Sequence, residues 1–421
     1  MMGFMARILR WIIVLTAGGL VACSANSSLP PAPTQAALAV LPTATASPDP
    51  LTPPTWTPAA RQDGVGGNFR SAAPLRPTDL PTATPLFPTR TPIPPTPTPT
   101  VPTPTATRYV SIIPTLPPTD ALGPSKLGLH VIRNNDPNIM EFVRHAQPAV
   151  IKAVDDLGFL AEVKEASPRT ITIGRINTDG PHYDQNPEQA ARDFVNTQLE
   201  QYRLNPAVDY WEGYNEPDPN HDRMVWFSRF EQERVKALAE HGFRAAIGGF
   251  AAGVPEFEEF ELFLAAIWEA KEHRGILSLH EYSAPVMNYG FGANLPGMEP
   301  HPERGALTFR YRWLYEEMLI PFGLDIPLVI SEAGIDGIIG NRPGPAGLGW
   351  REFGQYWVEQ GIGPSPEQAY LNQLAWYDAG VRRDGYVIGF TVFTAGGFGQ
   401  WETYNINSLL PQLTAYASSQ H

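Results

Sequence analysis

Beyond residue 124, eight short apolar runs rich in β-branched and aromatic residues alternate with longer amphipathic stretches. This alternation is typical of βα units built around a parallel sheet. The expected strands cover 127–132, 149–154, 170–176, 210–215, 244–249, 277–281, 328–331 and 387–393. Helical periodicity is clearest in 187–202, 224–241, 257–272, 308–321 and 365–382, with Pro187 in a first turn and Ser365 as a helix cap. We therefore predict an α/β fold, a (β/α)8 TIM barrel.

A doubly wound open sheet also alternates strands with helices, but it usually carries a glycine-rich phosphate turn after its first strand. Here that turn is Arg133-Asn134-Asn135-Asp136-Pro137, which contains no glycine. The remaining length of roughly 300 residues suits a closed barrel with one large core. A barrel also places its active site at the carboxyl ends of its strands, where the chemically interesting residues below are found.

The N-terminus is typical of an export signal. Arg7 and Arg10 precede the apolar run Trp11 to Leu20, which is too short to span a bilayer comfortably. The run ends in Leu20-Val21-Ala22-Cys23, which resembles a bacterial lipobox and implies cleavage before Cys23 and lipidation of its thiol. A buried cysteine behind an uncleaved anchor is the alternative. Both interpretations place the rest of the chain outside the cytoplasm, on the membrane.

Proline, threonine, alanine and serine dominate the segment that follows, which has too little apolar material to offset chain ordering. We expect a signal peptide at 1–22, a disordered Pro/Thr-rich tether at 23–124 and the barrel domain at 125–421. The net charge of −13 without basic runs makes nucleic acid an unsuitable partner. With a single cysteine, no internal disulfide can form. We expect a monomer.

The most specific motif is Trp211-Glu212-Gly213-Tyr214-Asn215-Glu216-Pro217-Asp218, in which a strand ends at an Asn-Glu pair and a proline stops the ladder. That position directs Glu216 into the barrel mouth. The motif resembles the fourth strand of glycoside hydrolase clan A, a group of retaining (β/α)8-barrel glycosidases. The resemblance implies that Glu216 is the acid/base and that Asn215 hydrogen-bonds the sugar 2-hydroxyl.

A second carboxylate ends the buried apolar run Pro327-Leu328-Val329-Ile330-Ser331-Glu332. Clan A enzymes carry their nucleophile on strand seven, so the resemblance assigns that role to Glu332. Retaining chemistry needs such a pair, with about 5–5.5 Å between the two carboxyl groups. A simple ion pair between Glu332 and an arginine such as Arg175 is the structural alternative.

The same resemblance suggests supporting roles for three further residues near this pair. Tyr282, in Leu279-His280-Glu281-Tyr282-Ser283, corresponds to the tyrosine that steadies the nucleophile. His280 is expected to contact substrate hydroxyls or the acid/base, or else to be a core donor, and Glu281 points to the other face. Arg175 is a candidate cation beside Glu332, although the family's arginine commonly sits one strand earlier; a surface salt bridge is the alternative.

Strand eight departs from the family, which generally presents a tryptophan there as a platform for the sugar. Phe393 at the strand end, or Trp401 in the following glycine-rich loop, is the candidate replacement. The long connections 284–301 and 335–364 carry aromatic residues that suit either a carbohydrate cleft or small satellite cores. The Gly248-Gly249 pair supports the strand register.

The sequence thus predicts retaining hydrolysis of O-glycosidic bonds in an oligo- or polysaccharide at the cell surface, with no cofactor and no metal. No Gly-x-Ser-x-Gly elbow, His-Glu-x-x-His motif or phosphate-binding loop is present. Two alternatives stay open: a barrel that binds carbohydrate without cleaving it, as an adhesin or sensor, and a transglycosylase that uses the same covalent intermediate.

Overall fold

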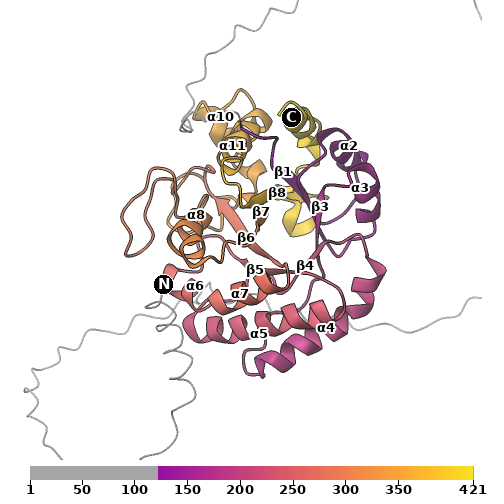
Figure 1. The fold of residues 1–421 in the computed structure, drawn as a ribbon. Coiled ribbons are helices and arrows are strands. Elements are labelled where there is room, and N and C mark those ends of the chain that lie inside the picture. Colours follow the sequence, from indigo (N-terminus) through magenta and orange to yellow (C-terminus); the bar gives the residue numbers. More distant parts are fainter. Residues whose placement is uncertain (1–121, 421) are drawn as a thin grey trace, which may run out of the picture. The chain divides into compact units, whose positions relative to one another are not determined.

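The computed structural model describes residues 122–420, whose strands form one closed parallel barrel (Figure 1). The strands follow one another around the barrel in chain order, and β1 closes it by pairing with β8. The (β/α)8 prediction is confirmed. The strands are β1 (Leu127–Val131), β2 (Val150–Val154), β3 (Ile171–Arg175), β4 (Tyr210–Glu212), β5 (Ala245–Phe250), β6 (Ile276–Ser283), β7 (Leu328–Ile335) and β8 (Val387–Ala395).

Helices connect the strands and surround the barrel in Figure 1. They are α2 (Pro137–Ala146), α3 (Leu160–Ala166), α4 (Pro187–Leu204), α5 (His221–Glu240), α6 (Phe257–Glu261), α7 (Leu264–Glu272), α8 (Tyr311–Leu314), α9 (Ile320–Phe322), α10 (Gly354–Glu359), α11 (Pro366–Val381) and α12 (Leu410–Ser418). A π-helical turn, η1 (Tyr315–Leu319), joins α8 to α9, and short 3-10 turns lie at η2 (Trp350–Glu352), η3 (Gly399–Tyr404) and η4 (Asn407–Leu409).

The predictions for residues 1–121, namely the signal peptide, the lipidation of Cys23 and most of the tether, lie outside the described residues. Within 122–420, no helix combines the length and the apolar character that crossing a bilayer requires.

The barrel interior is layered. Val150, Ile173 and Ile276 belong to a buried apolar layer contributed by β2, β3 and β6. Residues two positions further along a strand point to the same face. Lys152 and Arg175 therefore face the same interior, and both are buried. The interior changes from apolar to charged toward the carboxyl ends of the strands.

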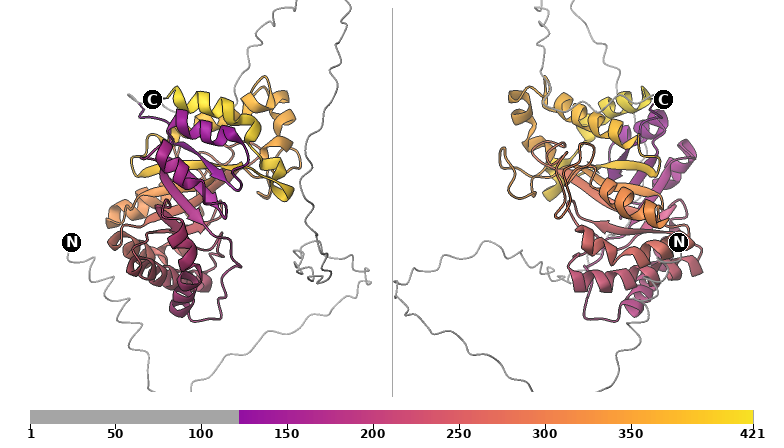
Figure 2. Two further views of the ribbon diagram at one scale, coloured as in Figure 1. Left: turned by 90° about the vertical axis from the view of Figure 1, so that its right-hand side faces the viewer. Right: turned by 60° about the vertical axis from the view of Figure 1, so that its left-hand side comes forward.

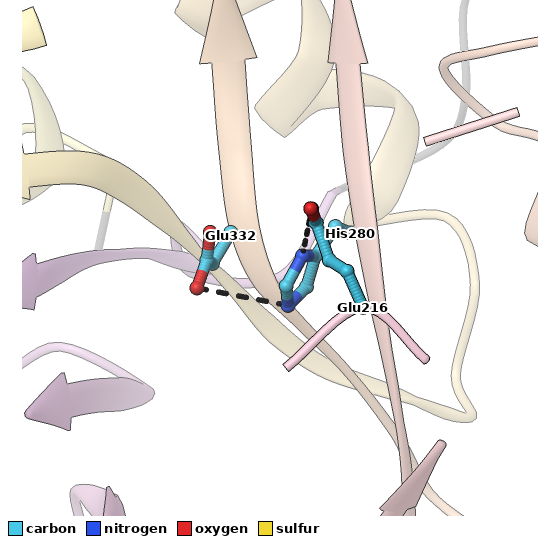
Figure 3. Close-up of side chains that lie close together, drawn as sticks. All are labelled: Glu216, His280 and Glu332. Carbon is cyan, nitrogen blue, oxygen red and sulfur yellow. Dashed lines mark hydrogen bonds and ion pairs between the residues drawn. The ribbon is translucent and has the colours of Figure 1, made fainter. Parts of the chain in front are cut away.

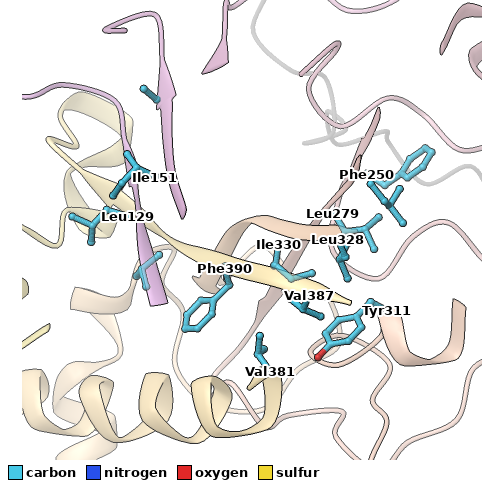
Figure 4. Packing of buried hydrophobic residues seen from close by; sticks show 14 of the residues in the cluster. Leu129, Ile151, Phe250, Leu279, Tyr311, Leu328, Ile330, Val381, Val387 and Phe390 are labelled. Atoms are coloured by element: carbon cyan, nitrogen blue, oxygen red, sulfur yellow. The ribbon is translucent and has the colours of Figure 1, made fainter. Parts of the chain in front are cut away.

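The larger core lies between the barrel and its helices (Figure 4). Alternate strand residues such as Leu129 and Ile151 face outward into it, and Phe390 of β8 is buried in the same cluster as Val381 of α11. Burial of this apolar layer on folding is the main favourable contribution to the stability of such a domain.

The helix predictions are largely confirmed. Ser365 caps α11 by accepting a hydrogen bond from the Gln368 N–H, and Pro187 opens α4. The expected helix at 257–272 is split into α6 and α7. The expected helix at 308–321 begins only at Tyr311, because Phe309 has a φ of +59°, which interrupts helical geometry.

The strand boundaries differ most around the predicted site. β4 ends at Glu212 instead of residue 215, whereas β6 and β7 run on to Ser283 and Ile335. Residues 213–216 lie outside the sheet, and Glu216 adopts a left-handed conformation, with a φ of +46°. Asn215 and Glu216 therefore stand on a turn, while the strand itself holds Glu332.

The C-terminal helix α12 packs against α2, the first helix of the barrel (Figure 2, where α12 is yellow and α2 indigo). Leu410, Leu413 and Ala417 are the buried residues of α12. The two ends of the barrel domain are thereby joined by helix packing as well as by the β1–β8 pairing.

Candidate active site

Glu216, His280 and Glu332 meet at the carboxyl ends of β4, β6 and β7 (Figure 3). The imidazole of His280 lies between the two glutamates. Its Nδ1 is 2.9 Å from Glu216 Oε1, and its Nε2 is 3.7 Å from Glu332 Oε1. One carboxylate oxygen of each glutamate lies within 4.8 Å of the other. The two carboxylates identified from separate motifs therefore face a common space.

The backbone positions Glu216. Its N–H donates to the Gly249 carbonyl at 2.9 Å, so the turn after β4 follows the end of β5. Gly249 and Gly248 have φ values of +65° and +99°, and a Cβ on Gly248 would come within 2.8 Å of the Ser278 carbonyl oxygen. Glycine is therefore required at Gly248 by the close packing of neighbouring strands.

Glu332 is buried, and its two oxygens have different partners. Oε1 accepts hydrogen bonds from Lys152 Nζ and Arg175 NH1, both at 2.9 Å, and His130 Nε2 is 3.5 Å away. Oε2 accepts a hydrogen bond from the Tyr282 hydroxyl at 2.8 Å. Positive charge is thus concentrated on one oxygen, and the other is bound only by a neutral phenol.

These partners determine the ionisation of Glu332. Burial alone would raise the pKa of this carboxyl, but His280, Lys152 and Arg175 outweigh burial and hold the pKa well below its usual value. Burial also raises the pKa of the Tyr282 hydroxyl well above its usual value, with the charge of Glu332 adding to the effect. Glu332 is therefore an ionised carboxylate at neutral pH, and Tyr282 is a protonated donor.

Glu216 has a more open environment. Its side chain is 38% exposed, against 6% for Glu332, while His280 beneath it is fully buried. A carboxyl group in this position contacts both solvent and the buried imidazole of His280. Glu216 is thus the accessible carboxyl group of the pair, and Glu332 is the buried, charged one.

Arg175 and Asn215 are linked. Arg175 NH1 donates to Asn215 Oδ1 at 2.5 Å as well as to Glu332, and Arg175 is only 7% exposed. The surface salt bridge considered for Arg175 is therefore wrong. The alternative ion pair with Glu332 is present, and it lies inside the site. Because Asn215 accepts through its oxygen, its amide N–H groups remain available at the mouth.

Sequence reasoning missed Lys152 and Glu212. Lys152 Nζ lies 2.8 Å from Glu212 Oε2, and Ser278 Oγ donates to Glu212 Oε1 at 2.7 Å. Burial alone would raise the pKa of Glu212, but Lys152, then Arg175 and His280, lower it to about 2. The signal was present, since a lysine stands within the apolar run Ala149–Val154 and Glu212 within the strand that leads to Glu216.

His130 and Asp336 were also missed. The Nδ1 of His130 is 2.8 Å from Thr394 Oγ1, and burial lowers the pKa of this histidine to about 4, so it is neutral beside Glu332. Asp336 follows β7 and accepts a hydrogen bond from the Tyr404 hydroxyl at 2.9 Å. Burial, with Glu216 and Glu332 nearby, raises the pKa of Asp336.

An aromatic cluster borders Glu332. Phe393 packs edge-on against Tyr282, at 6.0 Å between ring centroids, and against Tyr404 at 5.5 Å. Phe393 is only 6% exposed. Trp401 is more accessible, and its ring stands 5.2 Å from that of Phe393 at 84°. Of the two candidates for the sugar platform, Trp401 presents the more open ring.

The long loops contribute less to the mouth than their length suggested. Trp350 and Trp357 are buried and stack on Tyr370 of α11. Phe291 packs against Phe309 and against Trp376 of α11. These aromatics belong to the large core between the barrel and its helices, so the expectation of small satellite cores in these loops is wrong. Glu281 is likewise structural, because it accepts backbone hydrogen bonds from Phe309 and Tyr311.

Glu216, His280 and Glu332 each offer one atom that could ligate a metal ion, all within 4.8 Å of one another. Lys152 and Arg175 already bind Glu332 Oε1, and their positive charges oppose a third cation at that atom. The donor set therefore suits proton transfer and carboxylate chemistry better than metal binding.

Neither a protein-family model nor a curated protein matches the chain. Similar solved structures include an endo-1,4-β-D-mannanase from Thermotoga petrophila RKU-1, with 12% identity over 70% of this chain and 99% of that one, at a TM-score of 0.39. A GH5-4 broad-specificity endoglucanase from an uncultured bacterium has 11% identity over 75% of this chain and 98% of that one, at a TM-score of 0.41. A GH128 endo-β-1,3-glucanase from Amycolatopsis mediterranei has 13% identity over 69% of this chain and 98% of that one, at a TM-score of 0.40. At such identities and TM-scores, these likenesses do not transfer an activity to this chain.

Proposed function

We propose that the chain is a glycosidase that hydrolyses O-glycosidic bonds in an oligo- or polysaccharide with retention of configuration. The observation that carries this proposal is the pairing of an ionised, buried Glu332 with an accessible Glu216, with carboxylate oxygens within 4.8 Å. Retaining enzymes hold their carboxyl groups at about 5–5.5 Å, whereas inverting enzymes need about 6.5–9.5 Å to admit a water molecule.

In the first step, Glu332 attacks the anomeric carbon and forms an ester. The bond between that carbon and the leaving oxygen breaks, its electron pair goes to the oxygen, and Glu216 supplies the proton. Oε2 is the attacking atom, because its single neutral partner, Tyr282, leaves its electron density available. Oε1 stays on Lys152 and Arg175 and becomes the ester carbonyl oxygen.

In the second step, Glu216 takes a proton from water, and the resulting nucleophile attacks the anomeric carbon. The bond to Glu332 breaks, and its electron pair returns to the carboxylate, where Lys152 and Arg175 stabilise the charge. The amide of Asn215 hydrogen-bonds a sugar hydroxyl. Trp401 stacks on a sugar face. Exported by its signal and anchored through Cys23, the enzyme acts on carbohydrate at the cell surface as a monomer.

The test uses the full chain on a panel of aryl glycosides and polysaccharides, beside the variants Glu216→Gln and Glu332→Gln. The anomer released first is recorded by NMR. We expect retention, turnover reduced by at least about a thousandfold in Glu332→Gln, and a loss in Glu216→Gln that is largest for poor leaving groups. Carbohydrate binding without turnover by any form would contradict the proposal, and an inverted product would contradict the mechanism.

A further inference from the structure

A buried lysine shared between two carboxylates lies beneath the site. Lys152 Nζ is 2.8 Å from Glu212 Oε2 and 2.9 Å from Glu332 Oε1. Its side chain is fully buried, and that of Glu212 is 3% exposed. Water cannot compensate a charge in this position, so each ion depends on its neighbours.

The charges of this group balance before any reaction. Glu212 and Glu332 each carry a negative charge, and Lys152 and Arg175 each carry a positive one, with Arg175 3.6 Å from Glu212 Oε2. His130 is neutral at neutral pH because burial lowers its pKa. Among these four side chains, two anions therefore face two cations, and His280, which also lowers the pKa of both carboxyls, is paired with Glu216.

The covalent step disturbs this balance, if the proposed function holds. Esterification turns Glu332 into a neutral group, while Lys152 and Arg175 remain charged. Glu212 takes no part in the bond changes and keeps its charge. Removing one partner of a buried ion pair is strongly unfavourable because it leaves an uncompensated charge. Glu212 limits the excess to one positive charge in the intermediate; without it the excess would be two.

We propose that Glu212 is a positioning residue that serves as the permanent counter-ion of Lys152 while Glu332 is esterified, and thereby stabilises the glycosyl-enzyme intermediate. The hydrogen bond from Ser278 Oγ fixes its other oxygen, so the carboxylate stays on Lys152 throughout. Lys152 in turn stays where the returning carboxylate of Glu332 needs it.

The test is Glu212→Gln in the full chain, with an activated aryl glycoside that the wild type turns over. In this variant the intermediate and the transition state leading to it both lose the negative charge that compensates Lys152. We therefore expect kcat/KM to fall at least about tenfold. The value of kcat, limited by hydrolysis of the intermediate, should fall much less, so KM rises. Intact-protein mass spectrometry after rapid quenching, at a substrate concentration near the wild-type KM, should find a smaller covalently labelled fraction.

Two further variants separate charge from folding. Lys152→Met combined with Glu212→Gln restores the balance of charges and should recover part of the kcat/KM lost in Glu212→Gln alone. Glu231→Gln removes a carboxylate from another buried ion pair, with Arg234 on α5, which does not touch Glu332. This matched control should leave the ratio of kcat to kcat/KM unchanged.

Equal losses in kcat and kcat/KM for Glu212→Gln would overturn the inference, and so would a covalently labelled fraction as large as that of the wild type. It would also be overturned if the double variant had a kcat/KM no higher than that of Glu212→Gln alone. If Glu212→Gln does not fold, a double variant that folds but labels less than Lys152→Met would overturn it too. Absence of any wild-type adduct on Glu332 would instead contradict the proposed function itself.

Discussion

At the scale of single residues, the site is organised around the two oxygens of Glu332. Lys152 and Arg175 bind Oε1, and Tyr282 binds Oε2. The cations keep the carboxylate ionised despite burial, and the phenol holds its orientation without adding charge. The resemblance to clan A implied an arginine and a tyrosine for these functions. The structure adds a lysine from β2, the strand before that of Arg175.

Removing Lys152 should shift the acid limb of activity. In Lys152→Met the ionised form of Glu332 loses a cation, so the pKa of Glu332 rises and the acid limb of kcat/KM moves to higher pH. The pH dependence of kcat/KM in the full chain measures this shift. Lys164→Met, which removes a lysine paired with Asp209 away from the site, is the control and should leave the limb in place. An unmoved limb in Lys152→Met would refute the assignment.

At the scale of elements, the strands of the barrel hold the charged residues, and the turns adjust them. β7 extends past Glu332 and β6 past Tyr282, so both side chains are fixed by strand geometry. Glu216 stands on a turn held to Gly249. Outside the barrel, Glu281 of β6 binds the backbone N–H groups of Phe309 and Tyr311 and thereby fixes the start of α8.

Glu281 should make stability depend on pH. Burial raises the pKa of this carboxyl in the folded chain to about 7, from 4.5. Because the pKa of Glu281 is higher in the folded chain than in the unfolded chain, its contribution to the free energy of unfolding is complete below about pH 4.5. This contribution, roughly 3 kcal/mol, is lost as the pH rises through 7. Glu281→Gln stays neutral, so its free energy of unfolding should decline less over this range.

Urea unfolding of both proteins between about pH 4.5 and 8 measures this difference. Glu258→Gln, at an exposed position of α6, is the matched control and should follow the wild-type curve. Parallel curves for Glu281→Gln and the wild type would show that the carboxyl of Glu281 does not titrate differently on folding.

At the scale of the whole barrel domain, closure joins segments from opposite ends of the domain. β1 pairs with β8, and α2 packs against α12. The site depends on this closure, because His130 comes from β1 and Phe393 from β8, and their rings lie 4.7 Å apart beside Glu332. The C-terminal helix therefore supports the site without contributing a residue to it.

Weakening α12 should destabilise the barrel. Leu413 is fully buried, so Leu413→Ala should lower the free energy of unfolding by about 2–5 kcal/mol, through lost apolar burial and a residual cavity. Urea unfolding followed by tryptophan fluorescence measures the loss. Gln412→Ala, at an exposed neighbouring position, should change it by less than about 0.5 kcal/mol. Equal effects of the two variants would mean that α12 is not part of the folded core.

The sequence alone determined the eight strands and the two glutamates. Strand existence is encoded locally, because a buried parallel strand needs a short run of apolar, β-branched residues. The motif around Glu216 and the apolar run before Glu332 are equally local, so each residue could be assigned to its βα unit before their separation was known, although Glu216 stands on the turn after β4 and β7 runs on past Glu332.

Only the tertiary structure decided which other groups meet them. Lys152 and Glu332 are 180 residues apart and become neighbours because the barrel closes. In a strand buried on both faces, apolar periodicity does not say which residues point inward, so the roles of Lys152, Glu212 and His130 could not be derived from their runs. The conformation of Glu216 also depends on its contact with β5. The local pattern determines the elements, and the circular arrangement of strands determines the electrostatics of the site.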